Sequence, residues 1–194
     1  MDEADVTDYR YTNTWFEDKA QPLWEKHLQP RWHQPINYLE VGVCEGQSMI
    51  WALNHLPVAK AVGVDVWRWQ KRRQKEGMLK ARDNAYHNLK QWTDSGQLQI
   101  VEEDSRTALP KLEPDSFDLV YIDAGHWAPE ATLDMGNAMR LLKKGGMMVV
   151  DDLNRAWVMG KPQVLIAVHA FELIYTGRAV RDWKEGRQVA YIKR

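Results

Sequence analysis

Five short apolar runs constrain the fold of this chain more than any other feature of its sequence. No run exceeds eight residues, and the runs are rich in Val and Ile, which is typical of strands rather than helices. The apolarity within a run is continuous rather than alternating, so both faces of each strand are expected to be covered, as in a parallel sheet. The runs lie at 36–43, 59–66, 98–104, 117–124 and 147–152.

The segments between these runs predict helices. The segment 129–146 begins with Pro129, which suits a first helical turn, and the glycine pair at its end is expected to stop the helix. Two last runs, at 179–183 and 187–194, flank a short turn and are typical of a hairpin. This alternation predicts an α/β fold: a mostly parallel, seven-stranded sheet with helices on both faces and a C-terminal antiparallel hairpin. Further helices are expected at 46–56, about 72–92 and 161–177, with a short one after the run at 98–104.

Residues 1–35 precede the first run and are expected to form a helical segment that serves as a lid or cap over a substrate. Pro22 should interrupt or restart the helix there. Residues 36–194 hold all the runs, and no Pro- or Gly-rich linker divides them, so we expect a single domain. The short N-terminal segment leaves no room for a separate recognition domain, which favours small substrates over large ones.

Composition and charge narrow the possible settings of the protein. Apolar residues make up 44% of the chain and charged residues 27%, as in ordinary soluble globular proteins. The net charge of −1 argues against a dedicated nucleic-acid binder. The single cysteine, Cys44, cannot form an internal disulfide, the acidic start differs from a signal peptide, and no apolar run reaches the roughly 18 residues of a membrane span. We therefore expect a cytoplasmic protein without membrane contact.

Acidic side chains stand at or near the ends of the predicted strands. In open sheets of this kind, ligands bind outside the carboxyl ends of the strands, so side chains placed there are candidates for a site. One acid in such a place could be chance, but several that converge on one edge indicate a shared site. They are Glu40, Asp65, Asp104, Asp123, Asp151 and Asp152.

The first strand and the turn after it read "YLEVGVCEGQS", a loop whose glycines let backbone amides approach a ligand closely. It is not a dinucleotide fingerprint, because Cys44 replaces the middle glycine that makes room for a pyrophosphate. Glu40, beside the loop, instead favours a ligand with a positive amino group. Asp65 lies about 20 residues beyond the loop, where an acid can accept both hydrogen bonds from a ribose diol. S-adenosylmethionine has both the ribose and the cationic amino-acid tail.

Taken in order, "LEVGVCEGQS", "GVDVW" and "VEEDS" resemble the first three motifs of the class I S-adenosylmethionine-dependent methyltransferases. The likeness covers nearly all of 36–194, and the Lys-Gly-Gly turn before the fifth strand is also similar. The resemblance implies a Rossmann-like fold in which the glycine loop cradles the methionine end of the cofactor. The ends of the second and third strands would then hold its ribose and face its adenine. The implied cofactor-binding residues are Glu40, Gly42, Gly46, Ser48, Asp65, Val66, Asp104, Ser105 and Asp123.

A narrower likeness concerns the chemistry. "YIDAGHW" and "VVDDLN" resemble small-molecule O-methyltransferases of the catechol and caffeoyl-CoA type, and more closely the bacterial sugar and antibiotic O-methyltransferases. This resemblance implies that Asp123, Asp151 and Asp152 hold a divalent cation, Mg²⁺ or alternatively Mn²⁺ or Ca²⁺, because oxygen ligands suit these ions. It also implies that His126 is the general base, with Asp123 as a second catalytic residue.

This chain departs from those patterns at three positions. Asp152 stands where the catechol-type enzymes have Asn, and His126 stands where they have Lys. Ala124 replaces a glycine found in many relatives. The acids also allow simpler interpretations: Asp151 and Asp152 could cap the following segment, Asp123 could bind the cofactor's amino group without a metal, and His126 could be a buried histidine paired with a carboxylate.

The leading hypothesis is metal-assisted O-methylation of a small acceptor with adjacent oxygens, such as a sugar, a phenol or a natural product. The alternatives are a metal-independent or nucleic-acid methyltransferase and a non-catalytic S-adenosylmethionine-binding domain. A basic stretch at 67–77 could grip an anionic group of a substrate or be a solvated helix start. The apolar helix expected at 161–177 could pack on the sheet or against a second subunit, which leaves a homodimer open.

Overall fold

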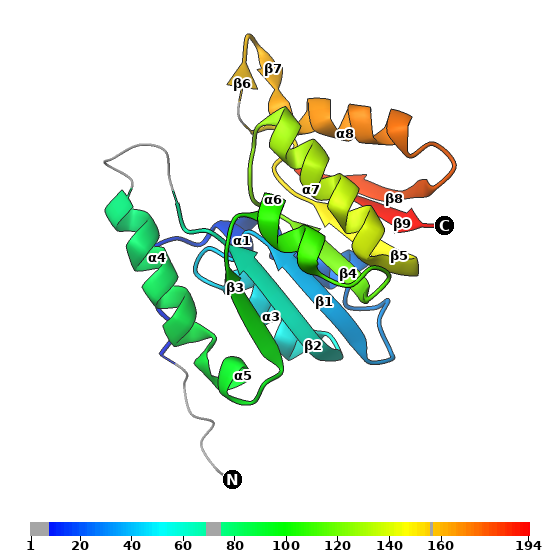
Figure 1. Cartoon of the computed structure of the whole chain (residues 1–194). Helices are drawn as coiled ribbons and strands as arrows, with labels where there is room; N and C mark the ends of the chain where they lie inside the picture. Colours follow the sequence, from blue (N-terminus) through cyan, green and yellow to red (C-terminus); the bar gives the residue numbers. More distant parts are fainter. Residues whose placement is uncertain (1–7, 69–74, 156) are drawn as a thin grey trace.

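A computed structural model describes residues 8–68, 75–155 and 157–194 of the chain. Its centre is a seven-stranded sheet in the order β3-β2-β1-β4-β5-β9-β8 (Figure 1). The neighbours from β3 to β5 are parallel, and β9 joins β5 and β8 in antiparallel fashion. The predicted sheet with its C-terminal hairpin is therefore confirmed. The strands are β1 (Ile36–Val41), β2 (Val58–Asp65), β3 (Leu98–Glu102), β4 (Phe117–Ile122), β5 (Leu142–Val150), β8 (Ala179–Glu185) and β9 (Gln188–Lys193).

The order of the strands places the binding edge. From β1 the chain winds outward through β2 to β3, and then returns to β4 on the other side of β1 before it continues to β5. This reversal between β1 and β4 leaves a crevice at the carboxyl ends of the two strands, where open α/β sheets bind ligands. The loops after β1, β2, β4 and β5 all meet at this edge.

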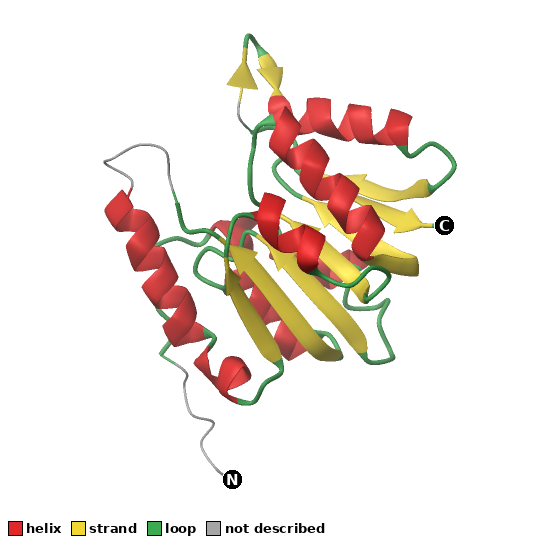
Figure 2. Cartoon of the chain, in the orientation of Figure 1, coloured by secondary structure: helices red, strands yellow, loops and turns green. Residues whose placement is uncertain are grey.

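Helices cover both faces of the sheet, as predicted (Figure 2). One face carries the core cluster around Trp24, Met49 and Leu89, and the other carries the cluster around Met135 and Phe171. The first face is covered by α1 (Trp15–Lys19), α2 (Gln21–His27), α3 (Gln47–His55), α4 (Lys75–Asn88) and α5 (Lys90–Asp94). The second is covered by α6 (Ser105–Ala108), the 3-10 turn η2 (Leu109–Lys111), α7 (Ala128–Leu141) and α8 (Gln163–Ile174).

The N-terminal helices pack directly on the sheet core. The helix breaks at Ala20, and Pro22 occupies the first turn of α2, as the sequence predicts. Trp24 is fully buried, with its ring edge-on to Tyr121 of β4 at a centroid distance of 4.7 Å and to Trp51 of α3 at 5.5 Å. Residues 15–28 therefore share one apolar core with the strands that follow.

Several element ends differ from the prediction. α7 stops at Leu141 rather than at the glycine pair, and β5 begins at once with Leu142. Gly145 has a φ of +81°, so it introduces an irregularity into the start of the strand instead of ending the helix. The helix expected over 72–92 is two helices, α4 and α5, and residues 72–74 lie outside the described residues. Two short strands that the sequence did not predict, β6 (Trp157–Val158) and β7 (Lys161–Pro162), form a separate pair.

The apolar helix α8 packs on the sheet through its inner face, where Val164, Val168 and Phe171 are buried. Its C-terminal end exposes Leu173 and Ile174. Among the described residues, no helix is both long and apolar enough to cross a membrane.

Candidate active site

The glycine loop after β1 lies directly against the end of β4. Gly42 has a φ of +96°, and a Cβ atom added there would lie 2.0 Å from the backbone carbonyl oxygen of Asp123. Only glycine fits this approach, because the side chain of any other residue would meet backbone atoms. The loop then leads through Cys44 and Glu45 to Gly46, the residue before α3. The predicted cofactor loop and the predicted metal-binding acid are therefore immediate neighbours.

Glu40 lies beneath the loop rather than in the open cleft. It is fully buried, and its carboxyl accepts hydrogen bonds from the Tyr38 hydroxyl at 2.7 Å and the Ser48 hydroxyl at 2.5 Å. Burial raises the pKa of Glu40 to about 8, although the hydrogen bonds from Ser48 and Tyr38 act in the opposite direction. Its contacts support the loop from below, and Ser48 reaches the cleft.

Asp65, at the end of β2, also holds the loop. Its carboxylate accepts backbone hydrogen bonds from Cys44 at 2.9 Å and from Trp67 at 2.8 Å. Burial raises its pKa against the effect of these backbone donors. The Trp67 indole nitrogen donates in turn to the Cys44 carbonyl at 2.8 Å. Val66, which lies between Asp65 and Trp67 in the sequence, is half-buried.

Asp104 caps the short helix α6, which begins at Ser105. Its carboxylate accepts the backbone N–H of Arg106 at 3.0 Å and pairs with the guanidinium of the same residue at 2.6 Å. These contacts, chiefly the side-chain hydrogen bond of Arg106, lower the pKa of Asp104 to about 2. Asp104, which the resemblance places near the adenine of the cofactor, is thus an ionised N-cap in the loop after β3.

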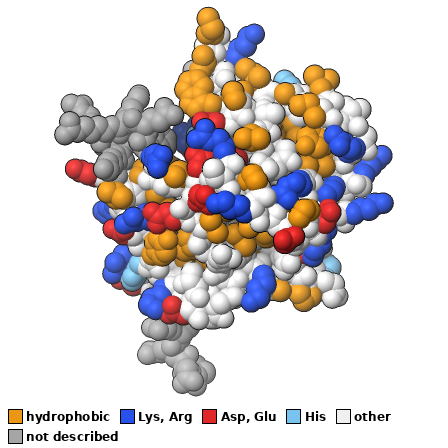
Figure 3. All heavy atoms as spheres, in the orientation of Figure 1, with side chains coloured by type: hydrophobic (Ala, Val, Ile, Leu, Met, Phe, Trp, Pro, Cys, Tyr) orange, Lys and Arg blue, Asp and Glu red, His pale blue; other side chains and the backbone are white. Residues whose placement is uncertain are grey.

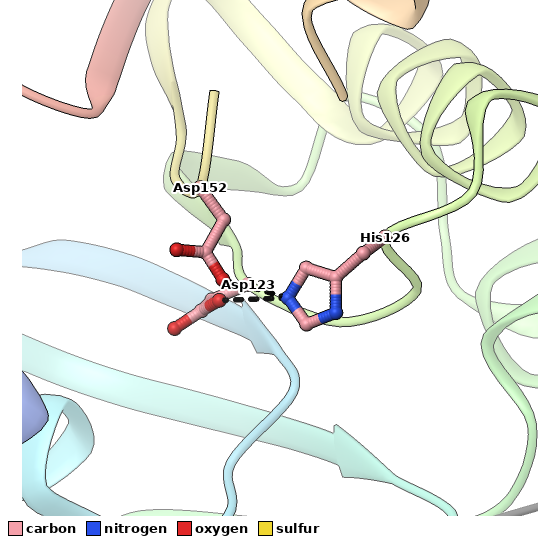
Figure 4. Close-up of side chains that lie close together, drawn as sticks. All are labelled: Asp123, His126 and Asp152. Carbon is pink, nitrogen blue, oxygen red and sulfur yellow. Dashed lines mark ion pairs between the residues drawn. The ribbon is translucent and has the colours of Figure 1, made fainter. Parts of the chain in front are cut away.

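Asp123, His126 and Asp152 form a cluster where β4 and β5 end (Figure 4). Asp123 follows β4, His126 lies in the loop to α7, and Asp152 follows β5. His126 Nε2 lies 2.8 Å from Asp152 Oδ2 and 3.8 Å from Asp123 Oδ1. Asp152 has a φ of +59°, a conformation that Asp tolerates better than most residues. One ligand atom from each of the three side chains lies within 4.8 Å of the others.

Asp151, the third predicted metal ligand, has a different environment. Its carboxylate accepts hydrogen bonds from the Tyr121 hydroxyl at 2.7 Å, the Gln188 amide at 2.9 Å and the backbone N–H of Asp152 at 2.5 Å. Arg187 Nε lies 3.2 Å from Oδ1, the oxygen that also accepts the Asp152 N–H. Asp151 therefore has donors on both oxygens, and it braces Asp152 from behind.

Two arginines, neither of them predicted from the sequence, complete the cluster. Arg155 Nε lies 2.8 Å from Asp152 Oδ2, and Arg187 Nη2 lies 3.1 Å from Asp152 Oδ1. Arg155 comes just after β5, whereas Arg187 comes from the tight turn between β8 and β9. The acids at this edge are therefore partly neutralised by cations of the chain itself.

The charges of the cluster set its proton affinities. Burial lowers the pKa of His126, but the two carboxylates beside it outweigh burial and raise the pKa to about 9. Burial raises the pKa of Asp123. Burial acts in the same direction on Asp152, but His126 and Arg155 overcome it and lower its pKa to about 2. Asp152 is thus the firmly ionised member of the cluster.

An open cleft with about 530 Å³ of empty space joins the glycine loop to the acid cluster. Its floor is built from the loop, Tyr121 and the acids. The N-terminal segment supplies one wall, through Asn13, Trp15 and Phe16. The predicted methionine end of the cofactor and the predicted chemistry thus share one cleft, and the expectation that residues 1–35 act as a lid or cap is compatible with this wall.

Comparison with known families identifies the fold and the activity class. A family described as a methyltransferase domain matches residues 39–153, more than half of the chain. The chain belongs to this methyltransferase family. It is an S-adenosylmethionine-dependent methyltransferase with the class I fold, which confirms the broader resemblance inferred from the sequence. No curated protein matches the chain by sequence.

Solved structures share the fold of this methyltransferase at low identity. An O-methyltransferase from Bacillus cereus in complex with S-adenosylhomocysteine is 20% identical, with a TM-score of 0.59 over 98% of this chain and 86% of that one. A candidate O-methyltransferase from Klebsiella pneumoniae is 17% identical, with a TM-score of 0.60 over 96% and 83%. A candidate rRNA methylase from Clostridium thermocellum is 11% identical, with a TM-score of 0.66 over 90% and 96%. Acceptors as different as these names suggest are compatible with one fold.

Proposed function

We propose that this methyltransferase transfers the methyl group of S-adenosylmethionine to an oxygen of a small acceptor with adjacent oxygens, assisted by a divalent cation. The observation that carries the proposal is the cluster of Asp123, His126 and Asp152, whose two acids line the same cleft as the glycine loop. The narrower resemblance to small-molecule O-methyltransferases points to the same chemistry.

The residues of the cluster fit a divalent cation. Asp152 Oδ1 is a buried atom without a hydrogen bond of good geometry to any described residue, although Arg187 lies near it. Asp123 and Asp152 supply the carboxylate oxygens that Mg²⁺, Mn²⁺ and Ca²⁺ prefer. Asp151, with its oxygens already bonded, would orient Asp152 rather than lead the coordination. When bound, such an ion favours the ionised form of an acceptor hydroxyl.

The remaining chemistry falls to side chains of the chain. His126 Nε2 faces both carboxylates, which raise its pKa in the cation-free protein. A bound cation would offset these two negative charges, so that the neutral imidazole could take the proton of the acceptor at Nε2. Methyl transfer itself needs no further group, because it depends on the acceptor oxygen and the sulfonium methyl being held in line. The cleft walls would supply this positioning.

The mixed charge on the face shown in Figure 3 supports a small acceptor over a nucleic acid. Figure 3 shows basic and acidic side chains interspersed on the face in view, without a field of one sign. Nucleic-acid binders usually gather Lys and Arg on one face. Residues 69–74 of the basic stretch lie outside the described residues, so its grip on an anionic group stays a prediction. A homodimer also stays a prediction.

The proposal is tested by measuring S-adenosylhomocysteine release with a panel of catechols, sugars and other vicinal diols, in Mg²⁺ and in EDTA. We expect turnover with at least one diol that EDTA abolishes and Mg²⁺ restores. Asp152→Asn and His126→Gln should each lower kcat by about 100-fold or more, the usual scale for a lost acid–base or ion-binding group, while the Kd of S-adenosylhomocysteine changes little. Full turnover in EDTA would exclude a role for the cation in the reaction. Full turnover in His126→Gln would exclude His126 as the general base.

A further inference from the structure

Glu45 is a buried acid in the glycine loop that the methyl-transfer chemistry does not use. It is only 2% exposed, and both of its oxygens accept hydrogen bonds from distant segments. Thr12 donates its backbone N–H at 2.8 Å and its hydroxyl at 3.0 Å. Asn13 donates its amide at 3.2 Å, and Asn84 of α4 donates its amide at 2.8 Å. A carboxylate has about four acceptor positions, so these donors use its full capacity.

Residues 9–16, which lead into α1 and include its first two residues, form a strap that these contacts hold beside the loop. Asn88 of α4 fastens its start, because it accepts the Arg10 N–H at 2.8 Å and donates to the Arg10 carbonyl at 2.9 Å. The same Asn88 amide donates to the backbone carbonyl of Glu45 at 2.9 Å. Gln47, one residue beyond Gly46, hydrogen-bonds the Asn13 carbonyl and accepts the Phe16 N–H at 3.4 Å. Loop and strap are thus joined along their length by side chains of the loop and α4.

The strap also forms part of the ligand cleft. Asn13, Trp15 and Phe16 line it opposite the acid cluster. Trp15 is 55% exposed, and the Arg155 guanidinium lies 5.8 Å from its ring centroid, over the ring. The strap therefore contacts Arg155, a residue that also pairs with Asp152.

We propose that Glu45 is a positioning residue for methyl transfer: it fastens the strap to the glycine loop, so that the loop takes its cofactor-binding shape only when the strap is closed. A shorter side chain leaves the donors of Thr12, Asn13 and the buried Asn84 without this acceptor, which favours the open strap. Because the loop carries the cofactor, opening the strap should weaken cofactor binding. The proposal requires only S-adenosylmethionine dependence, so it is independent of the acceptor and of any metal.

The experiment measures two quantities in the full chain: the Kd of S-adenosylhomocysteine by calorimetry and the amide hydrogen exchange of residues 9–16 and 43–48. In Glu45→Ala we expect fast exchange in both segments and an increase in Kd of about tenfold or more, within the range usual for coupled sites. Glu45→Gln should recover much of the loss, because a rotated Thr12 hydroxyl and a flipped Asn84 amide can accept from its NH₂ group. Thr12→Val should weaken binding less than Glu45→Ala, and should add little in the Glu45→Ala background.

A matched control changes the same N-terminal segment away from the loop. Lys26→Ala removes an exposed ion pair between α2 and Glu185 of β8. It should leave both the Kd and the exchange of the strap at wild-type values.

Each other outcome decides against the proposal. Fast exchange of the strap with an unchanged Kd would show that the strap does not shape the loop. If Lys26→Ala raises the Kd as much as Glu45→Ala does, Glu45 contributes only to the general stability of the protein and is not a positioning residue. If Glu45→Ala does not fold, Thr12→Val decides, because Glu45→Gln is expected to stay near the wild type: an unchanged Kd and unchanged strap exchange in Thr12→Val would overturn the proposal.

Discussion

Replacing His126 by Gln should change how the stability of the protein depends on pH. In the cation-free protein, burial of the imidazole lowers its pKa, but Asp123 and Asp152 outweigh burial and raise the pKa to about 9. A group whose pKa is raised on folding contributes stability that is fully present below its unfolded pKa, near 6.5. That stability is lost as the pH rises through about 9.

The size of the effect follows from the same values. One pKa unit corresponds to about 1.4 kcal/mol, so a rise from about 6.5 to about 9 contributes about 3 kcal/mol at low pH. This is an upper bound, because the His126 side chain is 26% exposed and water screens part of the interaction. For a domain of this length, about 3 kcal/mol corresponds to roughly 6–12 °C in Tm.

The assay is urea unfolding of the wild-type protein and of His126→Gln in EDTA at several pH values between 6 and 9.5. The informative quantity is the difference between the two proteins, because Glu40, with a pKa of about 8, also titrates in this range and cancels in the comparison. We expect the wild-type advantage to shrink by up to about 3 kcal/mol as the pH rises. Parallel curves for the two proteins would refute the assignment of a charged His126 between two carboxylates.

Two further changes test the loop and the N-terminal helices. Gly42→Ala should abolish S-adenosylhomocysteine binding and lower the Tm, because the added Cβ would lie 2.0 Å from the Asp123 carbonyl oxygen. The control Gly145→Ala is also at positive φ but has open space around its Cβ, so it should lower the free energy of unfolding by only about 1–2 kcal/mol. Equal effects of the two substitutions would contradict the close approach at Gly42. Trp24→Ala should lower the free energy of unfolding, measured in urea, by about 3–5 kcal/mol, because Trp24 is fully buried. Trp15→Ala, at a 55% exposed position, should change it by no more than about 0.5 kcal/mol. A small loss at Trp24 would contradict the shared core.

The sequence predicted what depends on local pattern. Continuous apolar runs indicated the parallel strands, and the rule for open sheets placed Asp123 and Asp152 at one edge, where the structure has them. Arg187 and Glu45 escaped notice, because their partners are set by folding over long distances and no local periodicity marks them. The helix before β5 was predicted too long, since a glycine pair stops a helix and also permits an irregular strand start, and only tertiary packing selects between the two.

Asp151 and Asp152 illustrate the same limit within one dipeptide. From the sequence alone, the two acids are predicted as equivalent ligands. In the structure the Asp151 carboxylate accepts hydrogen bonds from Tyr121 of β4 and Gln188 of β9, while the Asp152 carboxylate lies beside His126. The distinction depends on partners from other strands and on the positive φ of Asp152, neither of which a single sequence reveals.

The arginines at Asp152 give the proposed cation a competitor. Arg187 Nη2 lies 3.1 Å from Asp152 Oδ1, an oxygen that the ion would also need, and two positive charges at such a distance repel each other. Arg187→Gln should therefore increase the affinity for Mn²⁺ by about tenfold, as measured by electron paramagnetic resonance. Removal of the guanidinium charge lowers its repulsion of the ion by at least about 1.4 kcal/mol at an effective dielectric constant of about 20, and this energy corresponds to a factor of about ten in affinity.

Two matched variants sharpen this prediction. Arg187→Lys keeps the charge and should keep the wild-type Mn²⁺ affinity. Arg181→Gln removes an arginine that pairs with Glu172, whose side chain hydrogen-bonds Tyr191 rather than the acid cluster, and should change nothing. If Arg187→Gln binds Mn²⁺ no better than the wild-type protein, the ion does not share Asp152 with the guanidinium. If neither protein binds Mn²⁺, the arginines themselves are the cations that neutralise these acids, and turnover should persist in EDTA.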